Sequence, residues 1–259
     1  MKYSEVLTIL RRLAPEDTAL EGDPVGLLIE PGSESLQQVI VCLDTTPHVA
    51  HTAIEEHAGL IIAHHPLIFK PLARLERSNP ISSVAMSLVQ NGIGLYAMHT
   101  NWDTADGGIN DTLAELVSLE RPLRLQGNPQ NRIVRIGHLH RPMAADAFIS
   151  EIKNALDCTG TSTLRYAKPS GEQRPIHSVA VCGGAGAELV HEVIKAGADA
   201  FVTADVRQHE FVDAASRGLL LIDAGHEATE APGMQKLARI LATQLPEIYT
   251  TFCPNWPQL

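Results

Sequence analysis

The sequence predicts an α/β protein whose sheets are mostly parallel and covered by helices. Apolar, β-branched runs alternate along the chain with segments whose apolar residues recur at helical spacing. The shortest runs, LIIA and LLLI, are apolar throughout, which is typical of strands buried between two helical layers. With 259 residues and 44% hydrophobic side chains, the chain is long enough for one large or two modest domains.

The first half is predicted to contain an opening helix and two β-α-β units that share a strand. Residues 3–14 have the apolar spacing of an amphipathic helix, and the turn-rich residues 15–26 end it. Strands are then predicted at residues 37–44, 60–65 and 92–100, and helices at 47–58, 81–91 and 104–119. Short apolar strands joined through helices indicate parallel pairing.

The second half repeats this alternation after a turn-rich stretch at residues 120–130. Strands are predicted at residues 132–140, 161–167, 177–184, 199–206, 219–226 and 247–253, and helices at 144–156, 187–198, 208–218 and 232–245. We therefore predict two α/β domains, residues 1–125 and 126–259.

Charge excludes one class of partner. The formal net charge is −10 and no cluster of Lys and Arg is present, whereas binding to nucleic acid by phosphate neutralisation needs a basic face. No segment has the apolar length of a membrane span, and the N-terminal stretch lacks a signal-peptide core. We expect a cytoplasmic protein without membrane or nucleic-acid partners.

Cysteine and histidine usage direct attention to nitrogen and oxygen ligands. The cysteines are far apart and form no C-x-x-C pair, which indicates neither a disulfide framework nor a thiolate zinc site. They suit a reducing compartment. Twelve histidines in a chain with only 4% aromatic residues point to metal or proton chemistry.

Two adjacent histidines follow the predicted strand LIIA. Successive residues inside a strand point to opposite faces, but at a strand end both His64 and His65 can face one site. Pro66 stops the strand and keeps His65 extended. One buried and one surface histidine is the structural alternative. We favour ligands, because neutral imidazole commonly binds borderline metals.

Asp103 follows the next predicted strand by a few residues and is our candidate for a carboxylate that bridges two cations. An Asx-turn or helix cap explains an Asp before a Gly-rich turn equally well. His99 lies nearby and is expected to orient a ligand, with direct ligation or proton transfer as alternatives.

His226 and Glu230 stand four residues apart after the predicted strand LLLID. If the chain turns helically after Gly225, both lie on one side of that helix. Thr229 instead caps a later helix in the alternative interpretation, and Glu227 is the rival carboxylate. The spacing favours Glu230.

Two further segments are weaker candidates. Gly184 and Gly186 in VCGGAGAE form G-x-G, but Leu189 occupies the place of the third glycine of a dinucleotide fingerprint, so a tight β-to-α turn is favoured. Asp205 and His209 follow another strand, and they either line a pocket or begin a helix.

Four segments resemble, in order and spacing, the dinuclear metal-centre hexameric protein family, also called NIF-three-like and labelled GTP cyclohydrolase I type 2 homologue. They are residues 60–69, 98–111, 180–206 and 222–230, and the resemblance extends from residue 13 to Glu230. It implies two interlinked α/β domains, a two-metal site where the C-terminal His/Glu motif meets the first domain, and a ring-like homo-hexamer.

By motif, the resemblance implies two divalent metal ions per chain bound by His64, His65, Asp103, His226 and Glu230. It supports Glu230 over Glu227. Asp23 is expected to line the site. The short span from Leu125 to Ile176 indicates that the inserted domain of longer members is missing. A nitrogen and oxygen ligand set suits Zn, Fe, Mn, Co or Ni rather than Ca.

Two classes of function compete. The first is a metal-dependent hydrolase, GTP cyclohydrolase-like, acting on a nucleotide or another small molecule, with His99 as a candidate proton carrier. The second is a non-catalytic hexameric scaffold that binds, stores or delivers metal or has a regulatory role. A dinucleotide-binding oxidoreductase built on VCGGAGAE is a third, weaker alternative.

Overall fold

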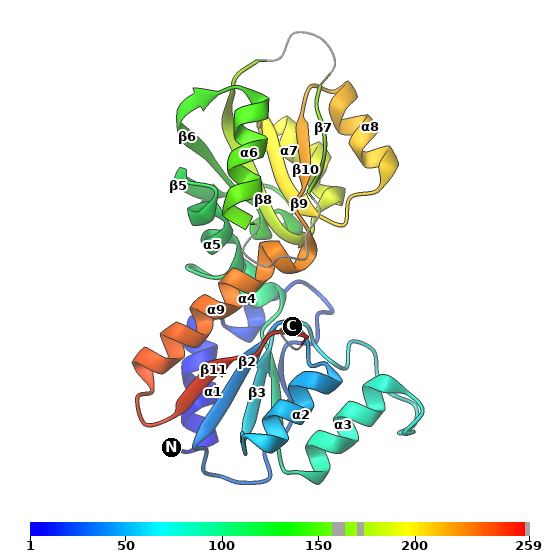
Figure 1. Cartoon of the computed structure of the whole chain (residues 1–259), viewed down its shortest axis with the longest axis vertical. Helices are drawn as coiled ribbons and strands as arrows, with labels where there is room; N and C mark the ends of the chain where they lie inside the picture. Colours follow the sequence, from blue (N-terminus) through cyan, green and yellow to red (C-terminus); the bar gives the residue numbers. More distant parts are fainter. Residues whose placement is uncertain (157–163, 170–173, 257–259) are drawn as a thin grey trace. The chain divides into compact units, whose positions relative to one another are not determined.

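A computed structural model describes residues 1–156, 164–169 and 174–256. The chain forms two compact units. The first comprises Met1–Asp106 with Met234–Leu259, and the second comprises Gly107–Gly233. Each unit is a sheet with helices packed on it (Figure 1), so the α/β class is confirmed. No helix in the described ranges is long and apolar enough to cross a membrane.

The first unit contains a five-stranded sheet in the order β1-β4-β3-β2-β11. Its strands are β1 (Gly26–Ile29), β2 (Gln38–Cys42), β3 (Leu60–Ala63), β4 (Gly94–Ala97) and β11 (Tyr249–Phe252). All neighbours are parallel except β1 and β4. The helices are α1 (Tyr3–Leu13), α2 (Pro47–Glu55), α3 (Pro80–Gln90), the short α4 (Thr100–Thr104) and the C-terminal part of α9 (His226–Gln244), with a 3₁₀ turn η1 (Glu16–Thr18).

Local sequence explains where the two covering helices of this sheet begin. Thr46 and Asn79 are N-caps, each accepting a hydrogen bond from a backbone N–H of the first turn, and a proline follows each at the first helical position. Helices α2 and α3 pack their apolar sides on one face of the sheet. The strand residues that point the other way, such as Val39 and Val41, are buried as well.

The second unit contains a six-stranded mixed sheet in the order β5-β6-β8-β9-β10-β7. The strands are β5 (Leu119–Arg124), β6 (Arg135–Met143), β7 (Arg165–Ala167), β8 (Ile176–Ala185), β9 (Ala200–Ala204) and β10 (Leu220–Asp223). The neighbours β8–β9 and β9–β10 pair in parallel, and the other described neighbours of this sheet pair antiparallel. The helices are α5 (Ile109–Leu116), α6 (Ala145–Leu156), α7 (Val190–Lys195), α8 (Gln208–Ser216) and the start of α9, with 3₁₀ turns η2 (Pro129–Ile133) and η4 (Ala187–Leu189).

The unit boundaries differ from the single boundary that the sequence predicts at residue 125. Strand β5 pairs with β6, and α5 packs against β8, so residues 107–124 belong to the second unit. Strand β11 pairs with β2, which returns the end of the chain to the first unit. Residues 161–163 of one predicted strand lie outside the described residues.

Candidate metal centre

Strand register gathers the polar side chains of the first unit. Cys42, Ala63 and Ala97 are aligned partners on the parallel strands β2, β3 and β4. Two residues beyond each of them come Asp44, His65 and His99. Because the strands are parallel and in register, equal offsets bring these side chains to the same edge of the sheet.

Three imidazole rings come together at this edge. The ring centroids of His64 and His65 are 5.0 Å apart, and that of His99 is 5.2 Å from the first and 5.6 Å from the second. One ring nitrogen of each lies within 4.8 Å of the other two. The two adjacent histidines therefore lie together at this edge, and His99 is close enough to be a third member of the same cluster.

Each of these rings is held through Nδ1 by an oxygen acceptor. Nδ1 of His64 is 2.7 Å from the carbonyl oxygen of Met98, and Nδ1 of His65 is 2.8 Å from Asp44 Oδ1. A carbonyl oxygen only accepts, so the proton of a neutral His64 resides on Nδ1 and Nε2 presents its lone pair. Metal-binding histidines are typically oriented in this way.

Asp103 faces His64. It lies on the short helix α4, where Oδ1 is 3.5 Å from Nε2 of His64, and both side chains are buried. With Nδ1 protonated, Nε2 of a neutral His64 and the carboxylate oxygen are both electron-pair donors. Two such donors facing each other in a buried site are stabilised by a cation or a proton between them.

Asp23 orients His99. Its Oδ1 is 2.7 Å from Nδ1 of His99, and Oδ2 accepts hydrogen bonds from the backbone and hydroxyl of Thr100. Burial raises the pKa of Asp23, but the hydrogen bonds from His99 and Thr100 outweigh burial and leave this pKa below its usual value. Asp23 thus remains an anion that fixes the His99 ring, a more definite role than lining the site.

The C-terminal end of the chain supports His65 through Asp44. Asn255 donates to Oδ2 of Asp44 at 2.6 Å and accepts from its backbone N–H at 3.0 Å. The Asp44 carboxylate therefore bridges Asn255 and His65. Sequence reasoning did not select Asp44, although it stands at the same offset beyond its strand as His65. No local sequence pattern marks Asn255 as part of the site, because it is brought to Asp44 by the pairing of β11 with β2.

The second unit brings His226 and Glu230 together on the first turns of α9. Helix α9 begins at His226, directly after the turn at Gly225, so the helical alternative for this segment is the one observed. Nε2 of His226 is 3.1 Å from Oε2 of Glu230, which is buried. Thr229 lies inside the helix and accepts a hydrogen bond from the N–H of Gly184 rather than capping a later helix.

Asp205 orients His226 in the way that Asp23 orients His99. Its Oδ2 is 2.7 Å from Nδ1 of His226, which turns Nε2 toward Glu230. Asp205 has a φ of 55°, a left-handed conformation that is unfavourable for a residue with a side chain. His209 is exposed in the first turn of α8.

The glycines of VCGGAGAE make room for Glu230. Gly184 has a φ of +64°, and a Cβ placed there would lie 2.1 Å from Oε1 of Glu230 and 3.1 Å from Nε2 of His226. A Cβ on Gly183 would lie 3.3 Å from Cγ of the same glutamate. These two glycines thus permit the close approach of a carboxylate, and Gly186 precedes the tight η4 turn.

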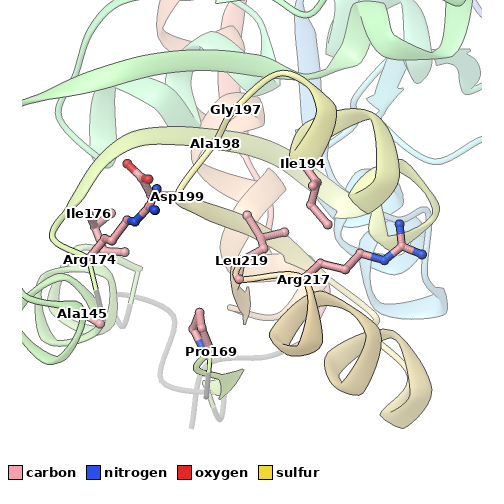
Figure 2. A pocket seen from close by; sticks show the side chains of 11 residues that line it. Ala145, Pro169, Arg174, Ile176, Ile194, Gly197, Ala198, Asp199, Arg217 and Leu219 are labelled. Carbon is pink, nitrogen blue, oxygen red and sulfur yellow. The ribbon is translucent and has the colours of Figure 1, made fainter. Parts of the chain in front are cut away.

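A cavity of about 460 Å³ lies at the other end of the parallel strands of the second unit. Asp199 and Leu219, which line it, precede β9 and β10, whereas Asp205 and His226 follow these strands. Figure 2 shows Arg174 and Arg217 on opposite sides of Leu219. Asp199 already accepts the backbone N–H groups of residues 177 and 178, and Arg217 bonds Asp213. This cavity contains none of the predicted ligands.

The sequence and fold match known proteins over nearly their whole length. A GTP cyclohydrolase 1 type 2 homolog from Streptococcus pneumoniae is 32% identical over 93% of this chain and 91% of its own. One from Nostoc is 35% identical with the same coverage, and the NIF3-like protein 1 of Drosophila melanogaster is 31% identical over 95% of this chain and 84% of its own.

Solved structures agree with this match. Reduced HcgD from Methanocaldococcus jannaschii is 27% identical, with a TM-score of 0.84 over 98% of this chain and 97% of its own. A Staphylococcus aureus hypothetical protein is 27% identical, with a TM-score of 0.85 over 98% of this chain and 96% of its own. The family model of Duf34/NIF3 (NGG1p interacting factor 3) matches residues 1–255. The chain belongs to the Duf34/NIF3 family.

Proposed function

We propose that this protein binds two divalent metal ions per chain and is a metal-dependent hydrolase. One observation carries the proposal: a histidine Nε2 faces a carboxylate oxygen twice, in His64 with Asp103 and in His226 with Glu230. In both histidines, Nδ1 lies within hydrogen-bond distance of an oxygen acceptor. The same arrangement occurs on different elements in the two units, and it is typical of metal-binding histidines, which supports the proposal.

The donor chemistry fits first-row divalent metals. Three imidazoles and two carboxylates, from His64, His65, His226, Asp103 and Glu230, form the proposed ligand set. Such a set suits Zn, Fe, Mn, Co or Ni. Thiolate ligation is disfavoured at Cys42, because burial raises the pKa of its thiol well above the usual value. That one pair of ions takes ligands from both units stays a prediction from the sequence.

The side chains around the ligands suit hydrolysis. When bound, a pair of divalent ions would lower the pKa of a bound water molecule and stabilise negative charge on a polarised oxygen of the substrate. Asp103 has two carboxylate oxygens and is our candidate for bridging. His99 is our candidate proton carrier, because its ring lies beside His64 and His65 while Asp23 fixes its Nδ1. Its Nε2 would then exchange the proton with the substrate.

The substrate class that we propose is a nucleotide. The names of the relatives from Streptococcus pneumoniae and Nostoc support GTP or a related compound. Phosphate groups bind readily to divalent ions. We also propose a homo-hexamer, on the basis of the family resemblance, and expect sedimentation to give about six times the chain mass of 28.0 kDa.

Metal content and turnover, measured together, test the proposal. The protein is purified, its bound metals are counted by elemental analysis, and hydrolysis of nucleotides and phosphoesters is screened for the wild type and Asp103→Ala. Asp106→Ala is the control, because Asp106 is an exposed carboxylate only three residues away. We expect two metal ions and hydrolysis in the wild type and the control, and loss of both in Asp103→Ala.

Other outcomes separate the alternatives. Activity that survives complete metal removal would exclude a catalytic metal. Bound metal without hydrolysis of any substrate class would favour the non-catalytic scaffold. His99→Gln should keep the metals and lose turnover if His99 carries protons, whereas loss of metal in this variant would make His99 a ligand instead.

A further inference from the structure

Phe69 is an exposed aromatic residue beside the candidate site of the first unit. Its side chain is 56% exposed, although burying a Phe ring is strongly favourable. The ring centroid lies 6.4 Å from that of His99, with an angle of 87° between the two planes. His99 in turn contacts the rings of His64 and His65. Phe69 is thus one ring away from the proposed ligands.

The geometry of this contact leaves a stacking surface. In a perpendicular pair, one ring directs its edge at the face of the other, so His99 covers at most one face of Phe69. At least one face is therefore not covered by His99. Aromatic faces of this kind bind planar ring systems, and the contact tolerates different nucleobases because every base has a π face.

The segment that carries Phe69 is basic in an acidic protein. Between β3 and α3 it contains Lys70, Arg74 and Arg77 against a single acidic residue, Glu76, whereas the whole chain has a net charge of −10. All four side chains are exposed. A local excess of positive charge around an aromatic ring suits a ligand that is both planar and anionic.

We propose that Phe69 selects nucleotides over ligands without an aromatic ring by stacking on the base of a nucleotide whose phosphates are held at the metal site. This inference rests on the proposed function and assigns the base a partner in the protein. It sets Phe69 apart from Leu75, which is similarly exposed in the same segment but is aliphatic. The base contributes to binding through its ring, and the phosphates through the metals.

Binding of a nucleotide and of its phosphate chain alone distinguishes the two contributions. GTP and inorganic triphosphate are titrated calorimetrically into the metal-loaded and the chelator-treated wild-type protein, and into Phe69→Ala, Phe69→Trp and Leu75→Ala. Stacking of a base on an aromatic residue corresponds to about tenfold or more in affinity. We expect Phe69→Ala to weaken GTP binding about tenfold and leave triphosphate binding unchanged.

The other variants complete the test. Phe69→Trp should retain the preference for GTP over triphosphate, and Leu75→Ala should behave as the wild type. Equal affinity of the wild type for GTP and triphosphate would overturn the inference, as would an unchanged GTP affinity in Phe69→Ala. An altered sedimentation coefficient in Phe69→Ala with unchanged GTP affinity would also overturn it, by assigning Phe69 to an interface between copies.

These titrations distinguish failure of the proposed function from failure of the proposed role of Phe69. If the wild type binds no metal, the hydrolase proposal fails, but the preference for GTP over triphosphate in the chelator-treated protein still decides the role of Phe69. If metal binds and the preference for GTP is missing, only the role of Phe69 fails.

Discussion

The two units present their candidate ligands by different means. In the first unit, in-register parallel strands place His65 at the same offset as its partner Asp44 and as His99, whereas Asp103 reaches His64 from the separate short helix α4. In the second unit, one helix supplies both His226 and Glu230, and left-handed residues complete the arrangement. The comparison teaches that a histidine–carboxylate pair can be built from a strand end and a separate helix, as in His64 with Asp103, or within one helix that has left-handed residues around it, as in His226 with Glu230.

The largest expected effect comes from removing a ligand on the helix. In Glu230→Ala, His226 keeps its orientation by Asp205 but loses the carboxylate 3.1 Å from its Nε2. Metal affinity should fall by more than the about 10–100-fold caused by losing an outer partner. Titration of apo-protein with zinc measures this, with Glu227→Ala as the control. Equal losses in both variants would refute the preference for Glu230.

Backbone substitution in the second unit has the next largest expected effect. Gly184→Ala places a methyl group 2.1 Å from Oε1 of Glu230, whereas Gly218, with a φ of +86°, has no atom within 4 Å of an added Cβ. Gly218→Ala should lose about 1–2 kcal/mol in the free energy of unfolding, because residue 218 adopts left-handed backbone. Gly184→Ala should lose at least as much, because its methyl group also meets the buried Glu230 carboxylate. Only Gly184→Ala should lose metal affinity as well. Urea denaturation and zinc titration measure the two effects.

If Gly218→Ala weakened metal binding as much as Gly184→Ala, the loss in Gly184→Ala could not be attributed to contact of the new methyl group with Glu230.

Replacing the left-handed residue Asp205 with glycine should raise the stability of the protein and lower its metal affinity. Asp205→Gly relieves a backbone conformation that costs on the order of 1–3 kcal/mol, so the free energy of unfolding should rise. Removing the acceptor of His226 Nδ1 should lower metal affinity about 10–100-fold. Arg121→Gly is the control, since Arg121 has a φ of 48°. It should gain stability without changing metal affinity.

The smallest effect is expected at Asn255, which is two contacts away from the proposed ligand His65. Asn255→Ala removes the amide that braces Asp44, while the Asp44 carboxylate can still accept from His65. Metal affinity should fall less than in Asp205→Gly, by about a few-fold, since the partner of the histidine itself remains. Trp256→Ala, at an exposed neighbour, is the control. A loss as large as that of Asp205→Gly would mean that β11 positions the site directly.

Much of the fold follows from periodicity, because fully apolar strands and amphipathic helices have distinct patterns. Two strands do not. In β5, LERPLR contains Pro122 and is mostly exposed, and the short β1 follows a turn-rich segment, so neither shows a strand pattern. Both acquire their conformation by pairing with a neighbour, β6 and β4 respectively. The start of α9 at His226 was likewise only one of two alternatives.

For the site, local sequence indicates where ligands stand but not what holds them. The ends of predicted strands indicate the segments that hold polar side chains, and the family resemblance implies which of these are ligands: His64, His65, Asp103, His226 and Glu230. The partners that orient them depend on contacts distant in sequence, such as Asp44 with Asn255. The two glycines at residues 183 and 184 suggested a turn, and their use as space for Glu230 required three-dimensional structure.

Diffraction from crystals grown with zinc or manganese, recorded at the absorption edge of the metal, tests the central claim most directly. Two anomalous peaks per chain are predicted, bonded to Nε2 of the histidines and to the carboxylates of the proposed set, His64, His65, His226, Asp103 and Glu230. Their positions also show whether one pair of ions takes ligands from both units. Peaks bonded to other residues, with none at these five, would contradict the account.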